Sequence, residues 1–287
     1  MFSNFRIVSF SPAGRKRNMA LLDRFLRANR FLIDRHEWWV NTPDPDDQAF
    51  IHELVERYPD FYSLAEVDVP YTGFGQRVIV ERLRRFYCER CQDARTIYLK
   101  IDDDFCFIGK DAIADLLEFR VAHPEYFLVM PPTVNSALQT HVVQRTSQLP
   151  REPLHFGYSP FDPGGYSSGA GAELIHHAFL DAINRSLKAP WTFPRWEFNE
   201  FERATIGATC FFGRDLAAFG GDVTDDDEQF LSCVKPQELN RVNAVSPCLP
   251  GRDAFFAHYA YAPQKEHLDS TDVLTSYETV ASWMRLM

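Results

Sequence analysis

Three consecutive acids, Asp102-Asp103-Asp104, follow directly on the short apolar segment 97–101. The β-branched and aromatic residues of that segment predict a buried strand. Unpaired carboxylates are costly to bury and repel one another, so we expect a positive charge at the end of this strand. Carboxylate oxygens are the ligands that Mg²⁺ and Mn²⁺ prefer. The pattern favours a divalent cation here over a solvated acidic turn.

A second acidic cluster, 225–228, follows Gly220-Gly221. A carboxylate in such a place can take the proton from a hydroxyl group as a general base. Asp227 is the first candidate for this role and Glu228 is the substitute. The alternative is that these acids only stabilise the N-terminus of a helix, where negative charge is favoured.

Strands and helices alternate through the first half of the chain. Apolar runs predict strands over 5–10, 37–41 and 62–69, and helical periodicity predicts helices between them, one capped by Asp46 or Asp47. This alternation predicts an α/β fold with a mostly parallel central sheet flanked by helices. Ligands of such sheets bind at the carboxyl ends of the strands, which is where the three aspartates lie.

The second half is less regular. Segment 131–171 is rich in Pro, Gly and Ser, which is typical of a loop over a site and equally of a surface insertion. Beyond it, a helix is predicted over 173–187, strands over 206–212 and 254–259, and a last helix capped by Thr271. No internal repeat or linker is evident, so we expect one domain.

Composition sets limits on the function. A chain of 287 residues with 45% hydrophobic residues can bury a large core. Its net charge of −10 argues against a nucleic-acid binder, which would present a basic face. No stretch is long and apolar enough to span a bilayer, and no signal peptide is visible. We therefore expect a cytoplasmic protein with no transmembrane segment, and peripheral association with a membrane stays open.

A strand that ends in Asp-x-Asp after three βα units resembles the GT-A glycosyltransferases. The acidic helix start at 224–231, and Ala257-His258-Tyr259 at the end of a late strand, resemble further elements of that family. Segments 98–135 and 205–277 look like a poorly described glycosyltransferase-like group of microbes. The resemblance implies one GT-A-like catalytic domain over 1–287, with a nucleotide-binding half at 1–130 and an irregular acceptor-binding half at 131–287.

The resemblance also implies a set of site residues. Asp102, Asp104 and His258 would hold Mn²⁺ or Mg²⁺ with the donor diphosphate, and His258 is alternatively a core residue bonded to a backbone carbonyl. Alternation along a strand would put Asp102 and Asp104 on one side and Asp103 on the other, unless Asp103 caps a turn. Arg15 is placed to meet the diphosphate, or is a solvated charge at a helix start. The candidate donor-binding residues are Ser11, Arg15, Asn41, Asp68, Arg77, Asp102 and Asp103.

These features predict a metal-dependent glycosyltransferase. Cleaving the bond between sugar and diphosphate builds negative charge on the leaving group, which a cation neutralises. The sugar would pass from a nucleotide-sugar donor to a hydroxyl of a glycan or glycoconjugate acceptor, with inversion, in surface polysaccharide or glycoconjugate synthesis. Trp191 or Trp196 is a candidate to stack on the acceptor. The alternatives are a metal-dependent phosphotransferase or phosphohydrolase, and a non-catalytic carbohydrate-binding protein of the same fold.

Overall fold

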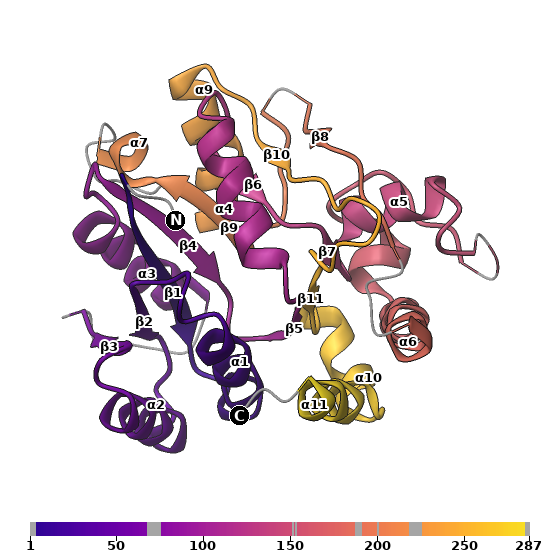
Figure 1. The fold of residues 1–287 in the computed structure, drawn as a ribbon, viewed down its shortest axis with the longest axis horizontal. Coiled ribbons are helices and arrows are strands. Elements are labelled where there is room, and N and C mark those ends of the chain that lie inside the picture. The colour runs from indigo at the N-terminus through magenta and orange to yellow at the C-terminus, as the bar shows by residue number, and fades with distance from the viewer. Residues whose placement is uncertain are drawn as a thin grey trace.

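A long central sheet runs through the computed structural model of the chain, and helices lie along it (Figure 1). The structure describes residues 4–67, 76–150, 152, 154–186, 191–199, 201–217 and 226–284. The strands within these ranges are β1 (Arg6–Ala13), β2 (Arg35–Val40), β3 (Tyr62–Ala65), β4 (Thr96–Ile101), β5 (Phe105–Ile108), β6 (Val129–Met130), β7 (Thr133–Val134), β8 (Trp196–Glu197), β9 (Ala208–Phe212), β10 (Ala244–Val245) and β11 (Phe256–His258).

The helices connect these strands and cover the sheet. They are α1 (Lys16–Ala28), α2 (Pro45–Arg57), α3 (Gln76–Arg90), α4 (Ala112–Ala122), α5 (Ala137–Arg145), the π-helical turn η1 (Pro163–Ser167), α6 (Gly169–Ser186), α7 (Gly213–Ala217), α8 (Asp227–Gln229), the π-helical turn η2 (Phe230–Val234), α9 (Lys235–Leu239), the 3₁₀ turn η3 (Ala262–Gln264), α10 (Lys265–Asp269) and α11 (Val273–Trp283). Helix α2 is capped by Asp44, whose side chain accepts hydrogen bonds from the N–H groups of Asp46 and Asp47. The predicted cap at Asp46 or Asp47 was therefore wrong, because Pro45 already occupies the first turn.

Eight strands of the described residues form the main sheet, in the order β3-β2-β1-β4-β9-β6-β10-β8. β3, β2, β1 and β4 are parallel neighbours, and β9 is antiparallel to both β4 and β6. β10 is parallel to β6 and antiparallel to β8. The predicted α/β fold, with a mostly parallel central sheet flanked by helices, is confirmed. A second sheet of the described residues has the order β5-β11-β7.

The candidate site residues lie at the carboxyl ends of the parallel strands of the main sheet. Because β1, β2 and β4 are parallel, their carboxyl ends meet there, and Arg15, Asn41 and Asp102 follow shortly after those ends. β9 runs the other way and begins at the same edge, where Ala208 pairs with Ile101. The topology thus brings together residues that are far apart in the sequence.

Aromatic packing fixes the strands that carry this edge. Phe10 of β1 stacks on Trp39 of β2 with ring centroids 3.9 Å apart, and Trp39 stacks on Phe86 of α3 at 4.8 Å. All three side chains are fully buried. Burying each such ring stabilises the fold by about 1.5–3 kcal/mol, so the strand ends are held on a rigid base.

The second half is more ordered than its composition indicates. Segment 131–171 contains β7, α5 and η1, so it is largely structured. The predicted strands over 206–212 and 254–259 contain β9 and β11, and the helix over 173–187 is α6. At the last helix the N-cap is Asp272, not the predicted Thr271, and its side chain makes no capping hydrogen bond.

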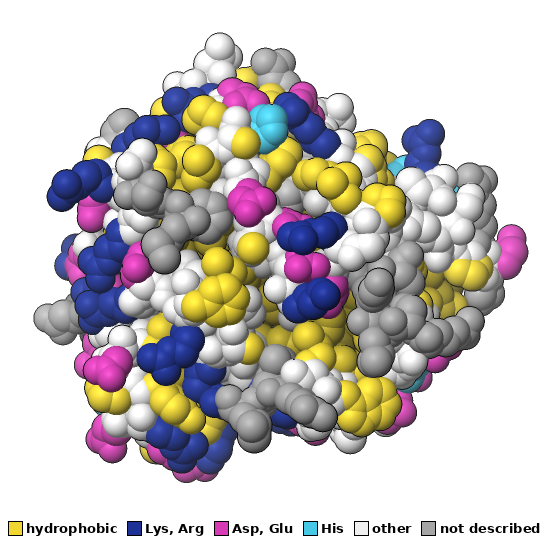
Figure 2. All heavy atoms as spheres, in the orientation of Figure 1, with side chains coloured by type: hydrophobic (Ala, Val, Ile, Leu, Met, Phe, Trp, Pro, Cys, Tyr) yellow, Lys and Arg dark blue, Asp and Glu magenta, His cyan; other side chains and the backbone are white. Residues whose placement is uncertain are grey.

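The surface is mixed in charge. Figure 2 shows Lys and Arg side chains interspersed with Asp and Glu over the face viewed in Figure 1. Among the described residues, no helix combines the length and apolarity needed to cross a membrane.

Candidate active site

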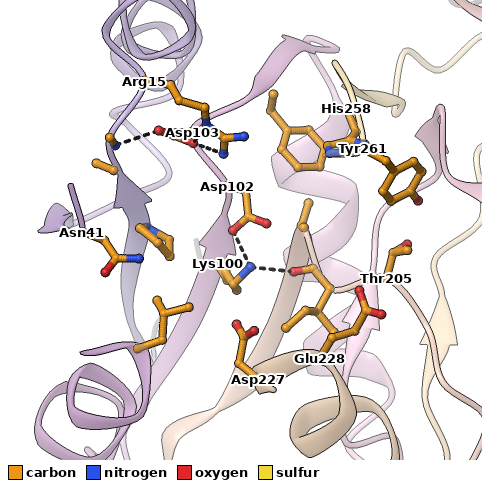
Figure 3. A pocket seen from close by; sticks show the side chains of 18 of the residues that line it. Arg15, Asn41, Lys100, Asp102, Asp103, Thr205, Asp227, Glu228, His258 and Tyr261 are labelled. Carbon is orange, nitrogen blue, oxygen red and sulfur yellow. Dashed lines mark hydrogen bonds and ion pairs between the residues drawn. The ribbon is translucent and has the colours of Figure 1, made fainter. Parts of the chain in front are cut away.

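A cavity of about 520 Å³ opens at the carboxyl ends of β1, β2 and β4. Figure 3 shows its width, with Arg15 and Asn41 on one wall and Thr205 and Tyr261 on the opposite wall. The remaining charged lining residues of the described chain are Lys100, Asp102, Asp103, Asp227, Glu228 and His258. Asp102 and Asp103 of one carboxylate cluster, and Asp227 and Glu228 of another far along the chain, therefore face one space.

Residues 102–104 form a turn, because β4 ends at Ile101. Asp103 is buried and accepts hydrogen bonds from the backbone N–H of Gly14 at 2.8 Å and from Arg15 Nε at 2.7 Å. Arg15 Nη1 also reaches Asp104 Oδ2, at 2.6 Å. The predicted alternation was therefore wrong: Asp103 and Asp104 share one guanidinium, and Asp102 lies apart from them (Figure 3).

Asp102 is paired with Lys100, a residue of β4 that the sequence analysis did not single out. Lys100 is buried, and its ammonium contacts Asp102 Oδ1 and donates to the carbonyl of Ile206 at 3.1 Å (Figure 3). Burial alone would lower the pKa of Lys100, but the carboxylates of Asp102 and Asp227 outweigh burial and raise it. A permanent positive charge thus sits in the middle of the cavity.

His258 lies on the cavity wall, at the end of β11. Its Nδ1 is 3.3 Å from the carbonyl oxygen of Asn135. Because a carbonyl can only accept, Nδ1 carries a proton and Nε2 faces Asp104 Oδ2 at 3.4 Å. Burial lowers the pKa of His258, but the Asp104 carboxylate outweighs it and raises the pKa. His258 therefore both bonds a backbone carbonyl and faces an aspartate.

The chain itself supplies part of the positive charge that was expected from a metal. Arg15 pairs with both Asp103 and Asp104, and Lys100 pairs with Asp102. Within the described ranges, no three or more His, Cys, Asp or Glu side chains are grouped so as to hold a metal ion. Asp104 Oδ1 is buried without a hydrogen bond, but Arg15 occupies the other oxygen. As arranged, these side chains do not fit Mn²⁺ or Mg²⁺, and the metal site at Asp102, Asp104 and His258 stays a prediction.

Asp227 and Glu228 begin α8, and both line the cavity. The helix is capped by Asp226, whose Oδ1 accepts from the N–H of Gln229 at 2.6 Å. Tyr87 of α3 donates to Asp227 Oδ2 at 3.4 Å. In Figure 3 Asp227 points toward Lys100, whereas Glu228 lies nearer Thr205.

The two carboxylates differ in environment. Burial raises the pKa of Glu228 to about 7, although Arg203, whose Nε is 2.7 Å away, opposes this effect. Burial also raises the pKa of Asp227, with Lys100 opposing. A carboxylate that titrates near neutral pH is suited to accept a proton during a reaction.

Neutral polar side chains line the wall opposite Asn41. Ser136 Oγ and Thr205 Oγ1 are 3.2 Å apart, and the Tyr261 hydroxyl accepts from the N–H of Ala137 at 3.3 Å. Asn135 adopts a left-handed backbone conformation, with φ of 58°, that asparagine tolerates better than most residues. Its Nδ2 donates to the carbonyl of Tyr259 and to Gln264 Oε1, both at 3.0 Å.

Of the other predicted donor-binding residues, some line the cavity and others do not or lie outside the described residues. Asn41 lines the cavity at the end of β2. Ser11 is fully buried and donates to the carbonyl of Ile101, so its hydroxyl ties β1 to β4. Asp68 lies outside the described residues, as do Gly220-Gly221, and the side chain of Arg77 is not described either.

Sequence reasoning missed several residues of the site. Lys100 carried a signal, since an ionisable residue inside the apolar run 97–101 must find a partner. Arg203 and Tyr261 carried none, because they come from irregular segments whose place depends on the whole fold.

No protein-family model and no curated protein matches the chain. Among solved structures, CMP:2-keto-3-deoxy-manno-octonic acid synthetase complexed with CTP is 13% identical over 98% of each chain, with a TM-score of 0.44. Residues 1–349 of S. aureus TarS in complex with UDP-GlcNAc are 14% identical over 97% of this chain and 66% of that one, with a TM-score of 0.40. A 4-diphosphocytidyl-2C-methyl-D-erythritol synthase is 16% identical over 45% of this chain and 60% of that one, with a TM-score of 0.33. The chain spans less than two thirds of the latter two, and similarities at this level do not carry a functional conclusion.

Proposed function

We propose that this protein is a transferase that moves a sugar from a nucleotide-activated donor to a hydroxyl group of an acceptor. The observation that carries the proposal is the cavity at the strand ends, with a buried ammonium at its centre and a carboxylate of near-neutral pKa on its far side. The acidic strand end at 102–104 and the acidic helix start at 225–228 support the same proposal from the sequence.

The wall formed by β1 and β2 suits the nucleotide. Arg15 and Asn41 follow those strands, and crevices at the carboxyl ends of parallel strands are the usual ligand sites of α/β sheets. An amide can pair with the edge of a base or with a ribose hydroxyl, and a guanidinium can pair with phosphate oxygens.

The centre of the cavity suits the diphosphate. When the sugar–phosphate bond breaks, negative charge grows on the leaving group, and a preorganised cation stabilises that charge. The Lys100 ammonium lies there, held by Asp102 and the carbonyl of Ile206. Binding a diphosphate would let Lys100 exchange part of its contact with Asp102 for a phosphate oxygen.

The far wall suits the acceptor. A hydroxyl group is a weak nucleophile until a base removes its proton, and a positioned base contributes about 10²–10⁴-fold. Glu228 has the more suitable pKa, at about 7, and lies on the side of Thr205 and Tyr261. We therefore favour Glu228 over Asp227 as the base, and an inverting course, which uses such a base, stays part of the proposal.

The test is turnover of a panel of nucleotide sugars, followed by release of the nucleoside diphosphate and NMR of the product. One set of reactions contains Mn²⁺ and a parallel set contains EDTA, which tests the predicted metal. We expect one donor to be consumed faster when a glycan acceptor is present. Hydrolysis of simple phosphate esters without any acceptor would replace the proposal with a phosphohydrolase, and carbohydrate binding without turnover of any donor would leave a binding protein.

A further inference from the structure

Three aromatic side chains form a row that begins at Tyr261, which lines the cavity on the side of Glu228. The ring centroids of Tyr261 and Tyr166 are 4.9 Å apart, and those of Tyr166 and Phe161 are 5.3 Å apart. The Phe161 ring lies 5.4 Å from the guanidinium of Arg203, which in turn binds Glu228. Tyr261 at one end of the row lines the cavity, and Phe161 at the other end is connected to the cavity residue Glu228 through Arg203. We call Phe161, Tyr166 and Tyr261 the aromatic rim.

Hydrogen bonds and close packing around η1 and Gln264 fix the position of the rim. Its turn η1 is capped by Asp162, whose Oδ2 accepts from the N–H of Gly165 at 2.8 Å. Gln264 Nε2 donates to the carbonyl of Gly165, and Gln264 Oε1 accepts from the N–H of Tyr261, both at 3.0 Å. Gly165 also packs closely on α5, since a Cβ at this position would lie 3.1 Å from Cα of Ala137. These contacts tie Tyr166 to Tyr261 across segments far apart in the sequence.

The rim still presents apolar surface to solvent. Phe161 is 52% exposed, which is unusual for a large ring with so many fixed neighbours. The predicted acceptor platform behaves differently: Trp191 is buried against Phe179 and Phe255, so that prediction was wrong for Trp191. Phe161, unlike Trp191, is exposed enough to serve as the stacking platform that was predicted for Trp191.

Polar groups line the part of the cavity wall to which Tyr261 of the rim belongs. The hydroxyls of Ser136, Thr205 and Tyr261 and the carboxylate of Glu228 line the same wall. A ligand that fits must combine an apolar face with several hydroxyl groups, because pockets pair hydrophobic walls with a few placed polar groups. A pyranose ring has both features, whereas a lipid chain or an apolar peptide would leave the hydroxyls unpaired.

Resting on the proposed function, we infer that the aromatic rim binds a pyranose ring of the acceptor, which stacks on Phe161 with a hydroxyl directed toward Glu228. This assigns a carbohydrate acceptor to the site and gives Phe161 a role in acceptor binding. The nucleotide lies toward the opposite wall and does not depend on the rim.

The experiment measures binding of methyl pyranosides of glucose, galactose, mannose and N-acetylglucosamine by saturation-transfer NMR, with and without a saturating nucleoside diphosphate. Phe161→Ala removes the ring, Phe161→Tyr keeps it, and Phe31→Ala removes an exposed ring that is not part of the rim. We expect at least one pyranoside to bind, about three- to tenfold more weakly to Phe161→Ala, as loss of one aromatic contact implies. Phe161→Tyr and Phe31→Ala should match the wild type.

Two outcomes would overturn the inference: no pyranoside binds at millimolar concentration, or Phe161→Ala binds it as well as the wild type. Failure of the proposed function would appear separately, as absence of nucleoside diphosphate binding in the same samples. If the wild-type enzyme binds nucleotide and transfers sugar only to a non-carbohydrate hydroxyl, the proposed function stands and the inference that the rim binds a pyranose is refuted.

Discussion

The carboxylates around the cavity serve two purposes at the level of single residues. Asp103 has a structural role, since its two oxygens accept hydrogen bonds from the backbone N–H of Gly14 and from the guanidinium of Arg15. Glu228 contacts Arg203 and still faces the cavity. Both oxygens of Asp103 are therefore engaged within the fold, whereas burial outweighs the pairing with Arg203 and leaves Glu228 able to change its protonation state near neutral pH.

Glu228→Gln keeps the shape of the side chain and removes its basicity. If Glu228 is the base, turnover should fall by about 10²–10⁴-fold while nucleotide binding is kept. In the wild type only the ionised form can accept a proton, so kcat/KM should rise with pH and level off above a pKa of about 7. Steady-state kinetics between pH 5 and 9 (about two units on either side of that value) would show this profile.

Asp227→Asn is the matched control for this assignment. Near-normal turnover in Glu228→Gln, together with a large loss in Asp227→Asn, would give the role to Asp227. A flat pH profile in the wild type would remove the general base from the account altogether.

At the scale of elements, β1 and β2 are joined by a buried polar pair. Ser9 Oγ lies 2.8 Å from His36 Nδ1, and both residues are fully buried. Burial lowers the pKa of His36 to about 3, so the ring is neutral in the folded protein. In the unfolded chain histidine titrates near pH 6.5, at about its ordinary value.

This difference predicts an acid-sensitive fold. Below pH of about 6.5 the unfolded state binds a proton that the folded state excludes, so stability contributed by His36 is lost as pH falls toward 3. Between about pH 6.5 and 4.5 the wild type should lose about 2–3 kcal/mol more unfolding free energy than His36→Gln. Urea unfolding at several pH values measures this, with His52→Gln on the exposed side of α2 as the control. Equal pH slopes for wild type and His36→Gln would contradict the assignment.

The elements that could be predicted from sequence are those with a long, regular pattern. Strands such as β1 and β4 are rich in apolar residues because nearly every side chain along them is buried. β6, β7 and β10 have two residues each, too few for any periodicity to appear. The carboxyl ends of the strands were therefore predictable, whereas the cavity wall opposite Asn41 depends on contacts that only the folded chain brings together.

The candidate site was predictable to the same extent. The two acidic clusters share one cavity, as their places at a strand end and a helix start suggested. The sequence indicated that Lys100 needs a partner, but which carboxylate pairs with Lys100 and which with Arg15 was not predictable, because the turn at 102–104 decides it. Alternation failed at Asp103 since the strand stops one residue before the acids.

At the scale of the whole molecule, the cavity spans the junction of the two halves of the sequence. Arg15, Asn41 and Asp102 come from the first half, and Thr205 and Glu228 come from the second. β9 makes this possible, because it inserts between β4 and β6 in the main sheet. A donor on one wall and an acceptor on the other would then meet over Lys100, at the centre of Figure 3.

Isothermal titration of nucleoside diphosphates into the wild type and Lys100→Met tests this account most directly. Lys110→Met, at an exposed lysine that does not line the cavity, is the matched control. We predict that one nucleoside diphosphate binds with 1:1 stoichiometry. Lys100→Met should weaken it at least about tenfold, since a charge-assisted hydrogen bond contributes about 1.5–3 kcal/mol, while Lys110→Met leaves it unchanged. Absence of binding by any nucleoside diphosphate, or equal affinity in the wild type and Lys100→Met, would contradict the account.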